Sequence, residues 1–192
     1  MRILVVGAPG AGMGTQGVRI ADRYGLTHIS SGDLLRRHMT DGTRIGRDVT
    51  AYVRRGDLVP DGLIMDMLRK PVVAASNRGG YVLDGFPRTV SQAESAYEIA
   101  RELGVEVQAV VHLDVPKEEL IRRLLARQRG AEDSADVIAH RLEIYDRNTR
   151  PMLDYYADRE RVVSVDGARP VPEVTAAILA QLGHPAWSPD RA

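Results

Sequence analysis

The amino-acid sequence predicts a three-layer α/β fold in which helices cover both faces of a five-stranded parallel sheet. Short apolar runs alternate along the chain with longer segments whose apolar residues recur at helical spacing. A glycine-rich turn separates the first apolar run from the first helical segment, as in phosphate-loop (P-loop) proteins. The chain has 192 residues, of which 44% are hydrophobic, so we expect a single domain, 1–192, with one core.

Five segments are predicted as strands because they are short and mostly apolar: 3–6, 27–30, 81–84, 109–114 and 162–166. Three of them end in an aspartate, namely Asp84, Asp114 and Asp166. In parallel α/β sheets, ligands bind beyond the carboxyl ends of the strands. We therefore expect the functional site at the edge of the sheet that carries the glycine-rich turn and these aspartates.

Helical spacing of apolar residues predicts helices over 18–24, 45–53, 93–103, 116–125 and 134–145, with a last helix after Pro172. Pro151 is expected to kink or break the helical pattern that precedes it. The last helix should end near Gly183, and the tail beyond it, with Trp187, should be loosely packed rather than a partner site.

Two stretches interrupt the alternation of strands and helices. Segment 31–60 carries consecutive helical patterns without a strand and is predicted to be a small helical insert. Segment 128–137 is short and polar, and is predicted to be a mobile lid. Both lie where a nucleotide pocket would need a cover.

Composition argues against several classes of partner. Lys+Arg and Asp+Glu are equal at 26 each, so no overall basic field favours nucleic acid or an anionic membrane. The chain has no cysteine, which excludes a disulfide framework and a cysteine zinc site. It has no apolar run of membrane-spanning length and its first residues resemble a strand rather than a signal peptide, so we expect a cytoplasmic protein.

Residues 7–16, GAPGAGMGTQ, are predicted to be a phosphate-binding loop. Small residues let several backbone N–H groups converge on one anion, and the helix that follows adds the positive end of its dipole. The pattern G-x-x-x-x-G-K-[ST] is met at Gly7 and Gly12 but broken at Met13 and Gly14. The loop therefore indicates phosphate binding, whereas Met13 removes the usual lysine charge.

Acidic and basic side chains near the loop complete the expected chemistry. Asp84, followed by Gly85 and Arg88, is a candidate to hold Mg²⁺ directly or through its waters. Arginines retain their charge in a dry site and bind phosphate well. Those expected at the pocket are Arg36, Arg88, Arg123, Arg127, Arg129 and Arg141. Those expected on solvated faces are Arg37, Arg47, Arg54, Arg55 and Arg122.

Seven segments occur in an order that resembles the adenylate kinases. They are 7–16, 29–36 (ISSGDLLR), 56–60 (GDLVP), 83–93 (LDGFPRTVSQA), 127–129, 141–145 and 165–170. The resemblance extends over nearly the whole chain, to about Leu182, and is to the short-lid bacterial type. It implies reversible phosphoryl transfer, in which ATP and AMP give two ADP, with Mg²⁺ and in a monomer.

The resemblance also implies roles for individual residues. ATP would be bound by Gly10, Ala11, Gly12, Met13, Gly14, Thr15, Arg123, Arg127, Gly167 and Arg169. AMP would be bound by Ser31, Gly32, Arg36, Leu58, Val59, Gly85, Phe86, Arg88, Gln92, Arg129 and Arg141, with Gln92 reading the adenine edge. The catalytic residues would be Arg88, Arg129, Arg141 and Asp84, and Asp84 would hold Mg²⁺ through water.

The sequence departs from the pattern of the family in three ways. Ser31 replaces a threonine but keeps its hydroxyl group, and lid residues Glu132 and Asp133 stand about one residue out of register with the usual acidic pair. Met13 is the largest departure, because losing one electrostatic contact of this kind costs about 10²–10³ in rate. A kinase of reduced activity and a nucleotide sensor that closes without turnover both stay open. A pyrimidine monophosphate kinase is disfavoured by Thr89 and Gln92.

Overall fold

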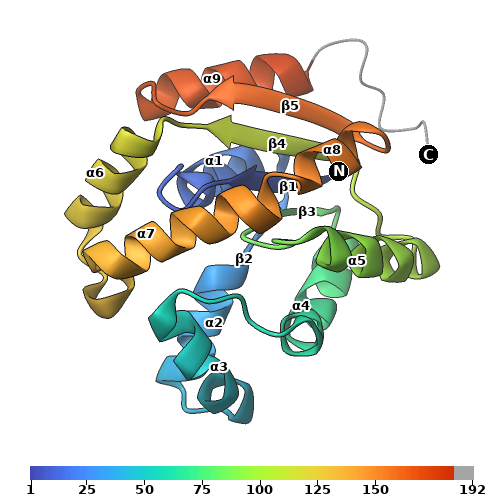
Figure 1. Ribbon diagram of the computed structural model, residues 1–192. Helices are drawn as coiled ribbons and strands as arrows, with labels where there is room; N and C mark the ends of the chain where they lie inside the picture. The colour runs from blue at the N-terminus through green and yellow to red at the C-terminus, as the bar shows by residue number, and fades with distance from the viewer. Residues whose placement is uncertain (184–192) are drawn as a thin grey trace.

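The computed structural model describes residues 1–183, so the expectations for Trp187 and the tail lie outside the described residues. Within residues 1–183, five parallel strands form one sheet in the order β2-β3-β1-β4-β5 (Figure 1). The strands are β1 (Arg2–Gly7), β2 (Thr27–Ser30), β3 (Tyr81–Asp84), β4 (Ala109–Asp114) and β5 (Arg161–Asp166). The predicted α/β fold and all five predicted strands are confirmed.

Strand β1 lies at the centre of the sheet and is buried on both faces, as alternate side chains show. Ile3 and Val5 belong to one core cluster, whereas Leu4 and Val6 belong to the other. The first cluster packs the sheet against α1 (Met13–Tyr24), α6 (Lys117–Arg127), α7 (Ala135–Ile144) and α9 (Val171–Leu182). The second packs it against α4 (Asp61–Ser76), α5 (Val90–Leu103) and α8 (Met152–Ala157). A strand buried on both faces explains why its sequence is a continuous apolar run.

Helices α2 (Ser31–Thr40) and α3 (Arg44–Arg55) follow β2 directly and project away from the sheet at the bottom of Figure 1. Their sequence signals are explicit: Ser30 and Thr43 cap the two helices by accepting backbone N–H bonds, and Gly56 ends α3 in the left-handed conformation. The two consecutive helices expected in this part of the chain are therefore present.

Helix α4 has no counterpart among the predicted helices. Its buried residues Ile64, Met67, Leu68 and Ala75 recur at helical spacing, but Pro71 between them is a helix-breaking signal. Packing against β3 and α5 stabilises this helix in spite of the proline, as tertiary contacts commonly override local propensity. Pro151, in contrast, behaves as predicted: α7 passes into a π-helical turn, η2 (Tyr145–Thr149), and the chain restarts as α8 after the proline.

Glu160 lies just before β5, at the edge of the sheet where the strands begin. Burial, followed by the negative charge of Glu106, raises the pKa of Glu160 to about 7. Because this pKa is above the usual value for glutamate, the folded state favours the protonated form. The contribution of this residue to stability is therefore complete below about pH 4.5 and is lost as the pH rises through 7.

We expect Glu160→Gln to raise the free energy of unfolding at pH 8 by about 1–2 kcal/mol, after allowance for its partial exposure to solvent. At pH 4.5 the variant and the parent protein should have nearly equal stability. Urea unfolding at the two pH values measures the difference, with the exposed Glu118→Gln as a control. An equal stabilisation at both pH values would contradict this assignment.

No helix in residues 1–183 is both long enough and apolar enough to cross a membrane.

Candidate active site

The loop after β1 has the backbone shape that phosphate binding requires. Gly10 and Gly12 adopt φ angles of 91° and 96°, in the left-handed region that favours glycine, and the Ala11 N–H donates to the Ala8 carbonyl at 3.0 Å. Helix α1 begins at Met13, within the predicted loop segment 7–16, and its first N–H groups have no partners within the helix. Such a loop and helix N-terminus form an anion-binding site.

The Met13 side chain is half-buried and packs against the core on the α1 face of the sheet. It also lines a cavity of about 50 Å³ that Arg88 and Arg141 share. An uncharged thioether thus lies on the same cavity as two guanidinium groups. A lysine at this position would place a third cation there.

A second cavity of about 50 Å³ lies between the insert helices and the end of β3. With the exception of Arg129, all residues expected to bind AMP line it: Ser31, Gly32, Arg36, Leu58, Val59, Gly85, Phe86, Arg88, Gln92 and Arg141. Ser31 Oγ is buried without a hydrogen-bond partner among residues 1–183, so it is open to a ligand. Arg88 and Arg141 line this cavity as well as the one at Met13, and therefore connect the two.

Neighbouring arginines around these cavities lower the pKa of one another through charge repulsion. Burial, followed by the charges of Arg88 and Arg127, lowers the pKa of Arg141 to about 10. Burial also lowers the pKa of Arg88, and the nearby Arg36 adds to this effect while Asp84 opposes it. Both groups are still protonated at neutral pH. A buried cluster of like charges is unfavourable by itself, so a bound polyanion would stabilise it.

Two acidic residues of segment 128–137 have different partners. Glu132 Oε2 lies 3.6 Å from Arg36 Nη1 and 3.8 Å from Arg141 Nη1, so this carboxylate occupies the positive cavity. Asp133 is buried and binds Arg127 through bonds of 2.5 and 3.1 Å, and it accepts the Arg129 N–H at 2.8 Å. Arg127 is thereby held by segment 128–137, and it lines neither of the two 50 Å³ cavities.

The expected ATP side is a wider and more open cavity of about 520 Å³. The expected residues that line it are Gly10, Ala11, Gly12, Thr15, Arg123, Gly167 and Arg169. Arg123 donates to Glu119 at 2.6 Å and to the Ala168 carbonyl at 3.3 Å. Hydrogen bonds from Arg122 and Arg123 lower the pKa of Glu119 to about 2, so this carboxylate stays ionised at physiological pH. No pattern in the sequence marks Glu119 as a residue of the site.

Asp84 is buried at the end of β3, where it is held by two residues of the neighbouring strand. Its Oδ2 lies 2.7 Å from His28 Nε2, and its Oδ1 accepts the Ser30 hydroxyl at 3.0 Å. Neither His28 nor Ser30 is among the residues that the sequence predicts for the site. The available signal was their spacing of two, which places both side chains on one face of β2, where Ser30 is in register with Asp84.

The residues present fit Mg²⁺ only as a nucleotide-bound ion. Residues 1–183 contain no group of three or more His, Cys, Asp or Glu side chains that could hold a metal. Mg²⁺ commonly keeps several waters and is bound by one or two carboxylates together with substrate phosphates. Asp84 meets that requirement, because each carboxylate oxygen can accept a further hydrogen bond from a metal-bound water.

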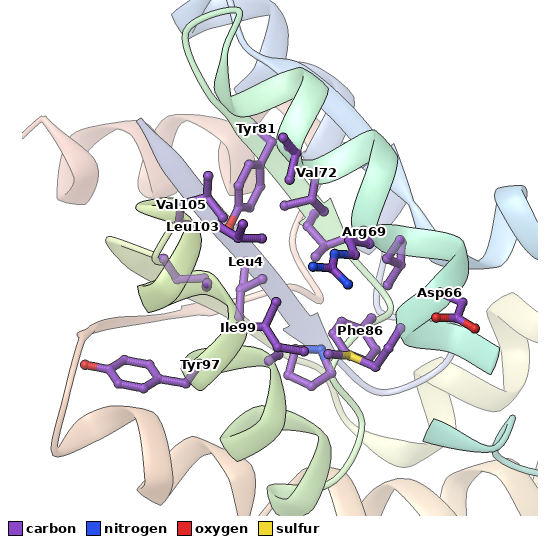
Figure 2. Close-up of a pocket in the computed structure, with 18 of the residues that line it drawn as sticks. Leu4, Asp66, Arg69, Val72, Tyr81, Phe86, Tyr97, Ile99, Leu103 and Val105 are labelled. Atoms are coloured by element: carbon purple, nitrogen blue, oxygen red, sulfur yellow. The ribbon is translucent and has the colours of Figure 1, made fainter. Parts of the chain in front are cut away.

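A separate cavity of about 130 Å³ lies between α4 and α5, on the face of the sheet covered by the second core cluster (Figure 2). Leu4, Val72, Phe86, Ile99 and Val105 point into it, and Arg69 extends over it from α4. Its lining is mostly apolar and contains none of the converging arginines or loop N–H groups. We therefore place the candidate site at the phosphate loop rather than in this cavity.

Comparison with known proteins gives a consistent picture. The family model described as adenylate kinase matches residues 5–161. An adenylate kinase from Kocuria rhizophila is 42% identical over 184 residues, which cover 94% of this chain and 98% of that protein. One from Synechococcus sp. strain WH7803 is 42% identical over 181 residues, with the same coverage of both chains. Adenylate kinase 1 from Nostoc sp. is 40% identical over 182 residues, which cover 95% of this chain and 98% of that protein. The chain belongs to the adenylate kinase family.

Proposed function

We propose that this enzyme transfers the γ-phosphoryl group of ATP to AMP, reversibly, to give two ADP, and that Met13 lowers the rate without abolishing it. One observation carries the proposal: Arg88 and Arg141 line both the cavity expected for AMP and the cavity at the phosphate loop. Guanidinium groups in that position can contact a phosphoryl group before, during and after its transfer.

In this proposal the protein acts by orientation and electrostatics. Loop N–H groups bind the ATP phosphates, and Arg36 and Arg88 bind the AMP phosphate. Arg88 and Arg141 face the charge of the transferring group, which is nearly all that such a reaction requires. The accepting AMP phosphate is already anionic, so no general base is needed. Mg²⁺ bound to the nucleotide would neutralise phosphate charge, and Asp84 would orient its waters.

Segments 31–60 and 128–137 are proposed as the two covers of the site. The contacts of Glu132 with Arg36 and Arg141 already join one segment to the other and to α7. Closure excludes water, which would otherwise accept the phosphoryl group. For AMP phosphate to reach the same arginines, Glu132 must share them or move aside.

Retained turnover is proposed because the other cations of the site remain. Two hydrogen bonds hold Arg88 in place. Its side-chain Nε–H donates to the Gly85 carbonyl at 2.8 Å, and its backbone carbonyl accepts the Thr149 hydroxyl at 2.8 Å. A preorganised guanidinium stabilises transition-state charge without rearrangement.

We further propose that the enzyme acts as a cytoplasmic monomer.

A second candidate is a sensor that binds adenine nucleotides and closes without turnover, which Met13 favours. The two functions are separated by following ATP, ADP and AMP by chromatography from both directions, starting with Mg·ATP plus AMP or with Mg·ADP. The proposal predicts the same final ratio of nucleotides from both starting points. Binding of both ATP and AMP in a calorimeter, with no interconversion at high enzyme concentration, would favour the sensor instead.

A further inference from the structure

We infer that Asp61 is a positioning residue that sets the base specificity of the enzyme by fixing the orientation of the Gln92 amide. This inference rests on the proposed function, and specifically on AMP as the acceptor. Gln92 is buried on α5 and lines the cavity expected for AMP. Asp61 is the first residue of α4, is exposed, and does not line that cavity.

Both ends of the Gln92 amide have a protein partner. Its Oε1 accepts the Arg88 backbone N–H at 2.8 Å, and its Nε2 donates to Asp61 Oδ1 at 2.8 Å. A backbone N–H can only donate, and an ionised carboxylate can only accept. The amide oxygen must therefore face Arg88 and the amide nitrogen must face Asp61. The backbone of Gln92 is held too, because its N–H donates to Thr89 Oγ1 at 3.0 Å.

The fixed amide has one N–H and one oxygen lone pair left for a ligand. Adenine offers the matching pattern, since its 6-amino group donates and its N1 accepts. A 6-oxopurine such as hypoxanthine offers the reverse, with O6 as an acceptor and N1–H as a donor. To read that base the amide would have to flip.

Asp61 penalises the flipped amide. Rotation by 180° would set Gln92 Oε1 against the Asp61 carboxylate and the amide NH₂ against the Arg88 N–H, so that both contacts become repulsive. The backbone donor at Arg88 is present whatever its side chain is, which leaves Asp61 as the partner that substitution can change. A site whose polar groups are left mispaired discriminates strongly against the wrong ligand.

The test compares AMP with IMP, which differ only in this donor and acceptor pattern, for the full-length protein and its Asp61→Asn and Asp61→Ala variants. Calorimetric binding of each nucleotide gives a readout that does not need turnover, and kcat and KM with Mg·ATP give a second. In Asp61→Asn the new side-chain amide can accept from Gln92 or donate to it, so the flipped orientation is no longer penalised at this contact and only the Arg88 backbone N–H still opposes it. We expect the preference for AMP over IMP to fall by about tenfold or more, with kcat for AMP little changed.

The matched control is Asp66→Asn, which removes an exposed carboxylate from the same helix, away from Gln92. It should keep the parent preference. An unchanged ratio of AMP to IMP affinity in both Asp61 variants would overturn the inference, even if both nucleotides bind more weakly, because that is what a purely structural role predicts. Failure of the parent protein to bind AMP would instead overturn the proposed function, so the two failures are distinguishable.

Discussion

Replacing Met13 with lysine is expected to raise kcat for ADP formation by about 10²–10³. The side chain at this position lines the cavity shared by Arg88 and Arg141, so an ammonium group there would face the transferring phosphoryl group. KM for AMP should change little, because Met13 does not line the cavity expected for AMP. Steady-state kinetics with a coupled assay for ADP measure both constants.

A size-matched control separates charge from packing. Met13→Leu keeps an apolar side chain of similar volume against the core and should leave kcat within about threefold of the parent value. If Met13→Leu raised kcat as much as Met13→Lys, shape rather than charge would limit the parent enzyme. An unchanged rate in Met13→Lys would show that the arginines supply all the charge that this transfer uses.

Replacing Arg88 with methionine is expected to lower kcat by about 10³ or more and to weaken AMP binding, because Arg88 lines both cavities at the centre of the site. The ligand-free protein should be as stable as the parent or more stable. Burial and the charge of Arg36 already lower the pKa of Arg88, which means that its cationic form is disfavoured in the folded protein.

Activity and thermal unfolding without nucleotide are the two measurements for Arg88→Met. Arg37→Met is the control. Arg37 is exposed on α2 and lines none of the three cavities of the site. The control should retain parent activity. A large loss of stability in Arg88→Met would mean that this arginine serves the fold, and the loss of activity would then need no catalytic explanation.

The elements predicted well are those whose signals are local. Buried runs such as 109–114 read as strands because both faces of the sheet are covered, and the glycines of the phosphate loop have φ angles that other residues rarely adopt. The residues expected to bind AMP converge on one cavity because the carboxyl ends of parallel strands meet at one edge. That topology could be inferred from the alternation of strands and helices alone.

What could not be predicted depends on contacts between distant segments. Helix α4 forms in spite of Pro71 because β3 and α5 pack against it, and this packing outweighs the local helix-breaking signal of the proline. The contact between Asp61 and Gln92 spans 31 residues, and the approach of Glu132 to Arg36 joins the two segments predicted as covers. These pairings are set by tertiary geometry, so a single sequence contains the residues but not their proximity.

The most direct test of the central claim is a single turnover of the parent protein with γ-³²P-labelled Mg·ATP and AMP, with enzyme in excess over ATP. Label is expected in the β-phosphate of ADP at a rate well below that of Met13→Lys, and Arg88→Met should lower this rate by a further factor of about 10³ or more. Complete binding of both nucleotides without labelled ADP in the parent protein would contradict the account and leave a nucleotide-binding protein without transferase activity.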